Sequence, residues 1–205
     1  MPEVKWASIF DEVLDHPDGA DDNVIEAFLS TVQQPLSDGE LAWLNDIQPE
    51  PVRWKIPDDP IPASYLSFLR WSNGGEFRNG ERLLQFLPAL DAVHGVRVTM
   101  LAYGVPYFKP GILPFAFNGG GIFYAFDMRL KAPASGEFPI VAAECGGLPG
   151  AIFPLADTFV AACRDKRSIE DLRDEEEEIT RPMCDECGEY LVCPECGRRG
   201  PTSLE

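Results

Sequence analysis

Residues 56–77, IPDDPIPASYLSFLRWSNGGEF, contain the signals that decide the fold. Pro62 stands where the first turn of a helix tolerates proline, because an N–H there has no intrahelical partner. Tyr65 and Phe68 then recur at helical spacing and give the helix an apolar face. Asn73-Gly74-Gly75 adopts left-handed backbone angles at little steric cost, so the sequence predicts that the helix ends there and a strand follows.

Glycine-containing turns predict two β-hairpins downstream. Asn79-Gly80 is a strong two-residue turn signal between two strands. Residues 111–129, GILPFAFNGGGIFYAFDMR, hold two apolar, aromatic-rich runs joined by a glycine run. Residues 88–103 have a helix-like pattern that Gly95 weakens.

The region before this stretch predicts three helices. The first fifteen residues carry apolar side chains at helical spacing and an acidic outer face. A second helix begins behind Asp21-Asp22, and Ser37-Asp38-Gly39-Glu40 has the S-x-x-E form of a capping box that starts a third. The prolines of residues 47–62 then favour an extended connection, in which residues 52–56 form a candidate edge strand.

The order IP, then xxYxxFL, then xxxNGGxF resembles the N-terminal half of the SUKH superfamily domain, also called the Smi/Knr-type domain. The hairpin at residues 111–129 is similar to a second feature of that family, and Asp127 falls on the family's aspartate position, where we expect a structural role. Residues 138–143 look like the next strand, and residues 154–165 resemble the family's closing helix. The resemblance covers about residues 40–166.

These patterns predict an α+β fold, with a mixed or antiparallel sheet of about five or six strands and helices mainly on one side. A small zinc knuckle is appended to it. The expected organisation is an N-terminal helical extension packed on the core at 1–39, the SUKH domain at 40–166, an acidic linker at 167–180 and a four-cysteine tail at 181–205.

The acidic charge is concentrated at the two ends of the chain. The formal net charge is −17, and residues 1–50 carry twelve acidic residues against Lys5 alone. Such a chain repels nucleic acid and attracts a cationic protein partner, although an acidic surface also serves solubility alone. The run at residues 174–178, DEEEE, is interpreted as a solvated linker, with a contact surface for a basic partner as the alternative.

Four cysteines near the C-terminus form the strongest chemical signal. Cys184 and Cys187, and then Cys193 and Cys196, make two C-x-x-C-G turns that together offer four thiolates for a tetrahedral site. Such a closed site is structural, because no ligand position remains for water or substrate. The sequence predicts Zn²⁺ there, and iron or two disulfides are the alternatives.

No combination of residues argues for an enzyme. Cys163 reads as a buried small hydrophobe, and Cys145 is a candidate exposed thiol with no histidine near it in sequence. The two histidines, His16 and His94, both fall in helix-like contexts, and no carboxylate spacing singles out an acid–base pair. The sequence also lacks a membrane-length apolar run and a secretion signal, so we expect no membrane partner and a cytoplasmic location.

The resemblance therefore implies a non-enzymatic binding role. Bacterial SUKH-family proteins act largely as immunity proteins that neutralise toxin domains, often nucleases. The first hypothesis is an immunity protein that blocks a cognate, basic toxin through an acidic surface, for which the N-terminal helices are the candidate. The alternative is a regulatory or scaffold protein in which the SUKH-like domain and the zinc tail each hold a different protein. Direct nucleic-acid binding is disfavoured by the charge.

Overall fold

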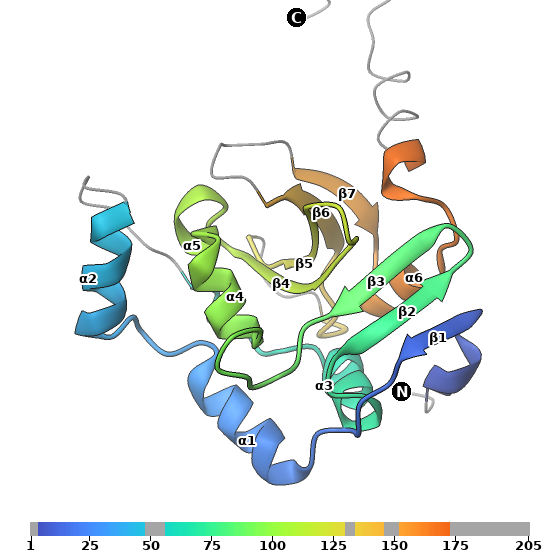
Figure 1. The fold of residues 1–205 in the computed structure, drawn as a ribbon, viewed down its shortest axis with the longest axis horizontal. Helices are drawn as coiled ribbons and strands as arrows, with labels where there is room; N and C mark the ends of the chain where they lie inside the picture. The colour runs from blue at the N-terminus through green and yellow to red at the C-terminus, as the bar shows by residue number, and fades with distance from the viewer. Residues whose placement is uncertain (1–3, 48–55, 130–133, 146–151, 173–205) are drawn as a thin grey trace, which may run out of the picture. The chain divides into compact units, whose positions relative to one another are not determined.

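The computed structural model describes residues 4–47, 56–129, 134–145 and 152–172 (Figure 1). The chain divides into two compact units, residues 1–167 and residues 168–205. The helices and strands given below all lie in the first unit. In the described part of the second unit, the Asp171 amide donates to Ser168 Oγ at 3.0 Å.

The described residues form one seven-stranded sheet in which spatial order follows sequence order. Each strand is antiparallel to its neighbours. The strands are β1 (Glu12–Asp15), β2 (Gly75–Asn79), β3 (Arg82–Phe86), β4 (Ile112–Phe117), β5 (Ile122–Asp127), β6 (Ile140–Glu144) and β7 (Ile152–Ala156). The α+β class, an antiparallel sheet and both predicted hairpins are therefore confirmed, and the strand count exceeds the expected five or six.

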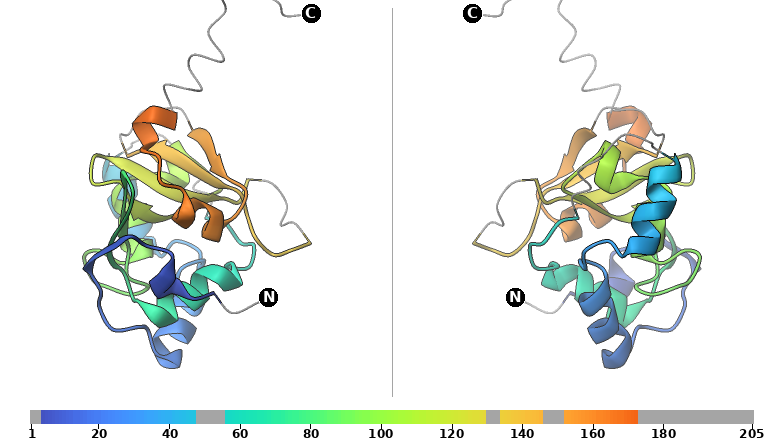
Figure 2. Two further views of the ribbon diagram at one scale, coloured as in Figure 1. Left: turned by 90° about the vertical axis from the view of Figure 1, so that its right-hand side faces the viewer. Right: turned by 90° about the vertical axis from the view of Figure 1, so that its left-hand side faces the viewer.

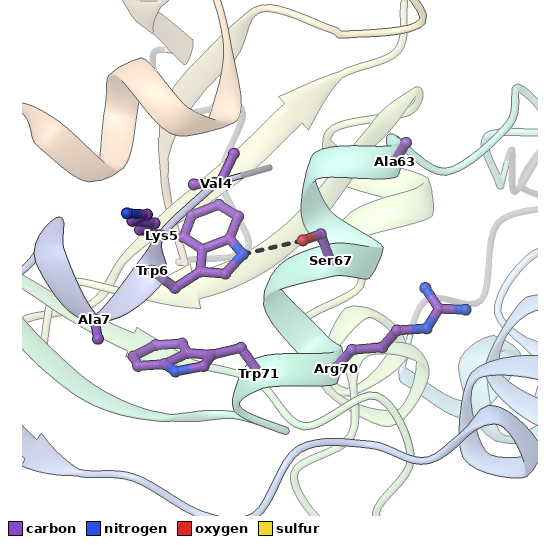
Figure 3. Close-up of a pocket in the computed structure, with 8 residues that line it drawn as sticks. All are labelled: Val4, Lys5, Trp6, Ala7, Ala63, Ser67, Arg70 and Trp71. Atoms are coloured by element: carbon purple, nitrogen blue, oxygen red, sulfur yellow. Dashed lines mark hydrogen bonds between the residues drawn. The ribbon is translucent and has the colours of Figure 1, made fainter. Parts of the chain in front are cut away.

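The strand β1 and the end of β7 lie where the sequence predicts helix. The prediction of a helix over the first fifteen residues is wrong, because residues 4–15 form a 3-10 turn, η1 (Trp6–Ser8), followed by β1. Trp6 is buried and its Nε1 donates to Ser67 Oγ at 3.1 Å (Figure 3), while the Asp11 amide donates to Arg78 O at 3.1 Å. These distant partners determine the conformation, and hydrophobic spacing alone does not reveal them.

The predicted closing helix at 154–165 is shorter than expected for a local reason. Residues up to Ala156 belong to β7, and α6 (Phe159–Arg164) begins only behind Thr158. The Thr158 side chain caps that helix, because its Oγ1 accepts a hydrogen bond from the Ala161 amide at 3.2 Å.

The other helices follow the sequence signals more closely. They are α1 (Asp22–Thr31), α2 (Asp38–Ile47), α3 (Ala63–Trp71), α4 (Val96–Ala102) and α5 (Val105–Phe108). The predicted capping box is present: the Ser37 amide donates to Glu40 Oε2 at 2.8 Å, and the Glu40 amide donates to Ser37 Oγ at 3.3 Å. The sequence pattern at 88–103 predicts a helix, but the helix α4 begins only at Val96.

The main core is aromatic and lies between the sheet and the neighbouring helices α3 and α6 (Figure 2). Phe68 of α3 lies 4.1 Å from Phe86 between ring centroids, and Phe159 of α6 lies 5.6 Å from Phe126. Phe123 and Phe126 of β5 point to opposite faces of the sheet, because side chains alternate along a strand. The ring of Tyr103, at the end of α4, packs on Phe123 with ring centroids 5.2 Å apart. Helices therefore cover both faces of the sheet, rather than mainly one.

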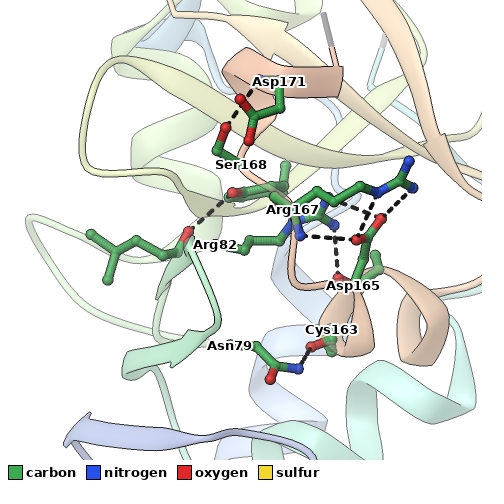
Figure 4. A network of polar contacts seen from close by, with 10 residues as sticks. Asn79, Arg82, Cys163, Asp165, Arg167, Ser168 and Asp171 are labelled. Carbon is green, nitrogen blue, oxygen red and sulfur yellow. Dashed lines mark hydrogen bonds and ion pairs between the residues drawn. The ribbon is translucent and has the colours of Figure 1, made fainter. Parts of the chain in front are cut away.

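Buried polar side chains join the β2–β3 hairpin to α6 (Figure 4). The side chain of Arg82 is fully buried, and it donates to Ala162 O and to Arg167 O, both at 3.0 Å. Its Nη2 forms an ion pair with Asp165 Oδ2 at 3.2 Å, but the two groups are not aligned well enough for a hydrogen bond. Asn79 Nδ2 donates to Cys163 O at 3.0 Å, which fixes the same helix end.

Arg97 of α4 holds α1 and α2 in place. Its Nε and Nη2 each donate to one carboxylate oxygen of Glu40 at 2.9 Å. Its Nη1 donates to the carbonyl oxygens of Thr31 and Gln34 at 3.0 and 2.9 Å. The hydrogen bonds from Arg97 are the main cause that lowers the pKa of Glu40 to about 2.

This ion pair predicts a specific pH dependence of stability. Because the folded-state pKa of Glu40 is below its ordinary value of 4.5, the stabilisation is present above pH 4.5 and is lost as the pH falls toward about 2. We expect Glu40→Gln to lower the free energy of unfolding by about 1.5 to 3 kcal/mol at neutral pH, and by progressively less in acid. Urea unfolding across this pH range measures the difference.

The matched control is Glu26→Gln. Glu26 is an exposed carboxylate on α1, and no basic side chain pairs with it in the part of the chain that the structure describes. A Glu40→Gln effect that stayed constant from neutral pH to about pH 2 would contradict the assignment.

Candidate protein-binding surface

Residues 11–26 form an acidic segment that runs through β1, the following loop and the first half of α1. In Figure 1 this segment passes along the lower side of the picture from β1 to α1. It contains no lysine or arginine. Its seven carboxylates are all exposed, and they belong to Asp11, Glu12, Asp15, Asp18, Asp21, Asp22 and Glu26.

Ion pairs neutralise only part of this charge. The three pairs are Asp11–Lys166 at 2.7 Å, Glu12–Arg78 at 3.0 Å and Asp22–Arg70 at 3.4 Å. Among the described residues no basic side chain pairs with the remaining four carboxylates, which we call the acidic margin: Asp15, Asp18, Asp21 and Glu26. Within the described residues, the acidic margin is thus a cluster of exposed, uncompensated negative charge that suits a cationic partner.

The end of α3 holds the loop that carries the acidic margin. The Asn73 amide donates to Asp18 O at 3.2 Å, and the Ala20 amide donates to Leu69 O at 2.8 Å. The buried Ser72 hydroxyl lies 3.3 Å from Pro17 O. The Asn-Gly-Gly sequence that ends the helix thus also positions the acidic loop, a role that helix-stop reasoning does not reveal.

Two glycines let the main chains approach closely at this junction. Gly75 has φ +106°, and a Cβ added to it would lie 2.6 Å from Asp15 O. A Cβ on Gly19 would lie 1.9 Å from Arg70 O. Neither position has room for a side chain, so the loop is held directly against α3 and β2.

The strand β1 lies at the edge of the described sheet and belongs to the acidic segment. Among the described strands it pairs with β2 alone. Val13 and Leu14 are 50% and 47% exposed, and a β-bulge interrupts the pairing between Val13 and Asp15. An approaching protein therefore meets apolar side chains and main-chain groups beside the carboxylates.

The described cysteines are not activated thiols. Cys163 is buried, as predicted, and burial raises its pKa. Cys145 is half-buried rather than exposed, and burial raises its pKa to about 12 despite the opposing charge of Lys109. Both thiols are therefore protonated near neutral pH and are poor nucleophiles.

The histidines and Asp127 also take structural positions. His16 lies in the exposed loop after β1, 4.5 Å from the Trp71 ring, and His94 lies in the turn before α4, so the helix-like context predicted for both is wrong. Asp127 accepts two hydrogen bonds from Arg129 at 2.7 Å, in agreement with its predicted structural role. Hydrogen bonds from Arg129 are the main cause that lowers the pKa of Asp127.

Several sequence predictions fall outside the described residues. They are the cysteine set Cys184, Cys187, Cys193 and Cys196, the acidic run at 174–178 and most of the candidate edge strand at 52–56. Within the described ranges, no group of three or more His, Cys, Asp or Glu residues could hold a metal ion. In the same ranges, no helix is long and apolar enough to cross a membrane.

The fold and its exposed acidic segment are consistent with a protein-binding domain. Residues 58–162 match the SMI1 / KNR4 family (SUKH-1), and the chain belongs to this family. Domains of this family are generally non-catalytic binding or immunity domains. No curated protein matches the chain. The match begins before α3 and ends within α6, so it includes both segments that carry the sequence resemblance.

Gly75→Ala tests the junction that holds the loop. Because the substitution combines an unfavourable φ with a main-chain clash, we expect it to lower the free energy of unfolding by about 1 to 3 kcal/mol. It should also speed hydrogen exchange at the Ala20 amide. Gly39→Ala is the control, since Gly39 lies in α2 with no atom within 4 Å of an added Cβ, and alanine there should be neutral or stabilising.

Proposed function

We propose that the protein is an immunity protein of a bacterial toxin system, and that it binds a basic toxin domain through the acidic margin. The observation that carries this proposal is the set of four exposed carboxylates without a basic partner among the described residues. Their loop is fixed to the SUKH core by main-chain hydrogen bonds. Family membership supports a binding role in place of catalysis.

The charge arrangement suits an inhibitor of a nuclease. A nuclease presents a basic cleft that recognises phosphates, and protein carboxylates can occupy the same positive field. The acidic margin spans twelve residues of one continuous segment, from Asp15 to Glu26. A preformed loop binds without the entropy cost of ordering it, so the hydrogen bonds to α3 contribute to affinity.

In this function, attraction between opposite charges speeds the association of the protein with its toxin. Exposed charges act over roughly 8 to 10 Å at physiological salt, so association should slow as ionic strength rises. The chemistry needs no catalytic residue, and the proposed location is the cytoplasm, where an immunity protein would meet a toxin that has entered the cell.

Neutralising the acidic margin is the direct test. We expect the combined variant Asp15→Asn, Asp18→Asn, Asp21→Asn and Glu26→Gln to weaken binding to the toxin encoded beside the gene by about tenfold or more, mainly through slower association. Asparagine still caps α1 at position 21, so the fold is preserved. Association rates at several salt concentrations, together with toxin neutralisation, measure the effect.

The control variant removes the same charge elsewhere. It neutralises four exposed acids away from the segment, namely Asp38, Asp46, Asp58 and Asp157. Equal weakening by both variants would mean that overall charge, not the acidic margin, attracts the partner. If neither variant weakened binding and residues 168–205 alone retained a partner, the scaffold function would be favoured.

We also propose that the cysteine-rich tail binds one structural zinc ion. Cys184, Cys187, Cys193 and Cys196 supply the ligand number and spacing that support this assignment. We expect about one zinc per chain in protein purified without added metal, and its loss in a Cys184→Ser, Cys187→Ser variant. Iron in the purified protein, or four thiols that react only after reduction, would refute zinc.

A further inference from the structure

A groove of about 580 Å³ lies between the N-terminal segment and α3 (Figure 3). The indoles of Trp6 and Trp71 line it, together with Lys5, Ser67 and Arg70. Clefts that bind small ligands or side chains of a partner commonly measure roughly 300 to 1,000 Å³. The groove is thus large enough to receive a short piece of another molecule.

The core fixes the indoles that line this groove. Trp6 is 3% exposed, its Nε1 donates to Ser67 Oγ at 3.1 Å, and its ring packs edge-on against Phe68 at 5.3 Å. Trp71 is half-buried and stacks on Phe10 at 6.1 Å with an interplanar angle of 13°. The indole of Trp6 is therefore a buried support of the groove, and the preformed indole of Trp71 is the aromatic surface that a ligand can reach, which lowers the entropy cost of binding.

The charge of the groove is opposite to that of the chain. The net charge is −17, yet the groove is lined by two cations and by no carboxylate. Lys5 has no acidic partner among the described residues, and Arg70 uses only Nε for Asp22, at 3.4 Å. In Figure 3 Lys5 lies beside Trp6 at one end of the groove, and Arg70 lies on α3 at the other end, with its guanidinium extending away from the indoles.

We propose that this groove is a second binding site, which takes an acidic segment of a partner protein that also carries an aromatic or large apolar side chain. The apolar side chain would pack on Trp71, and carboxylates would pair with Arg70 and Lys5. Two separated cations flanking an aromatic surface suit a few carboxylates on a peptide. A nucleic acid presents a continuous row of phosphates, which the surrounding acids repel.

This site does not depend on the immunity function. The acidic margin selects cationic partners, whereas the groove selects anionic ones, so one can fail without the other. Trp71 lies between them, because its ring also contacts His16 of the acidic loop at 4.5 Å.

The test begins with a library of random peptides of about seven residues, selected on the full-length protein. We expect enrichment of sequences that combine Asp or Glu with Phe, Trp or Leu, and a synthetic peptide of the enriched sequence should change tryptophan fluorescence. Its affinity should fall about tenfold or more in a Lys5→Ala, Arg70→Ala variant. The acidic margin variant described above should bind the peptide at least as tightly as the wild type, because it removes negative charge near the groove.

The matched control is Arg78→Ala, Lys166→Ala, which removes two exposed cations outside the groove. This control should leave peptide affinity unchanged. Selection of basic peptides, equal affinity in the two double variants, or tighter binding of single-stranded DNA through Lys5 and Arg70 would each overturn the proposal. The removed side chains are exposed, and matching thermal unfolding curves will show that the fold is retained.

Discussion

The packing of Phe68 against its aromatic neighbours is the contact on which the rest of the structure depends. Its ring centroid lies 4.1 Å from that of Phe86, 5.3 Å from Trp6 and 5.9 Å from Phe159. One side chain of α3 therefore joins the sheet, the N-terminal segment and the closing helix. Burying these large rings stabilises the fold through the hydrophobic effect. It also fixes how the three elements are oriented, because aromatic pairs prefer particular ring orientations.

Both candidate binding surfaces derive from this packing. The end of α3 supplies main-chain hydrogen-bond partners for the loop that carries the acidic margin. The exposed side of the same helix forms one wall of the groove lined by Trp6 and Trp71. The two surfaces carry opposite charge although they share Trp71 as a neighbour. One core thus carries two chemically different candidate contact regions.

Local signals in the sequence predicted most of the local structure. The helix α3, the Asn79-Gly80 hairpin and the capping box at Ser37 each depend on residues close together in the chain. The strand β1 was missed because its stabilising partner, β2, lies more than sixty residues later. The same limit applies to Arg97, whose hydrogen bonds to the α1–α2 connection cannot be read from helical spacing.

In the candidate site, too, some features can be predicted from the sequence and others depend on the tertiary fold. The concentration of acid near the N-terminus is visible in the composition, and so is a preference for cationic partners. Which carboxylates remain unpaired is not visible, because the partner cations belong to distant parts of the chain, namely Arg70, Arg78 and Lys166. The groove could not be predicted either, since Trp6 and Trp71 meet only through the tertiary fold.

The buried guanidinium of Arg82 determines where a shortened chain can stop. Its counter-charge, Asp165, and one of its carbonyl acceptors, Arg167, both follow the last residue of α6. A fragment cut at Arg164 would lose both the Asp165 carboxylate and the Arg167 carbonyl that hold this buried guanidinium, which costs more than the loss of three residues in a solvated tail. A fragment for expression or crystallisation should therefore extend at least through Arg167.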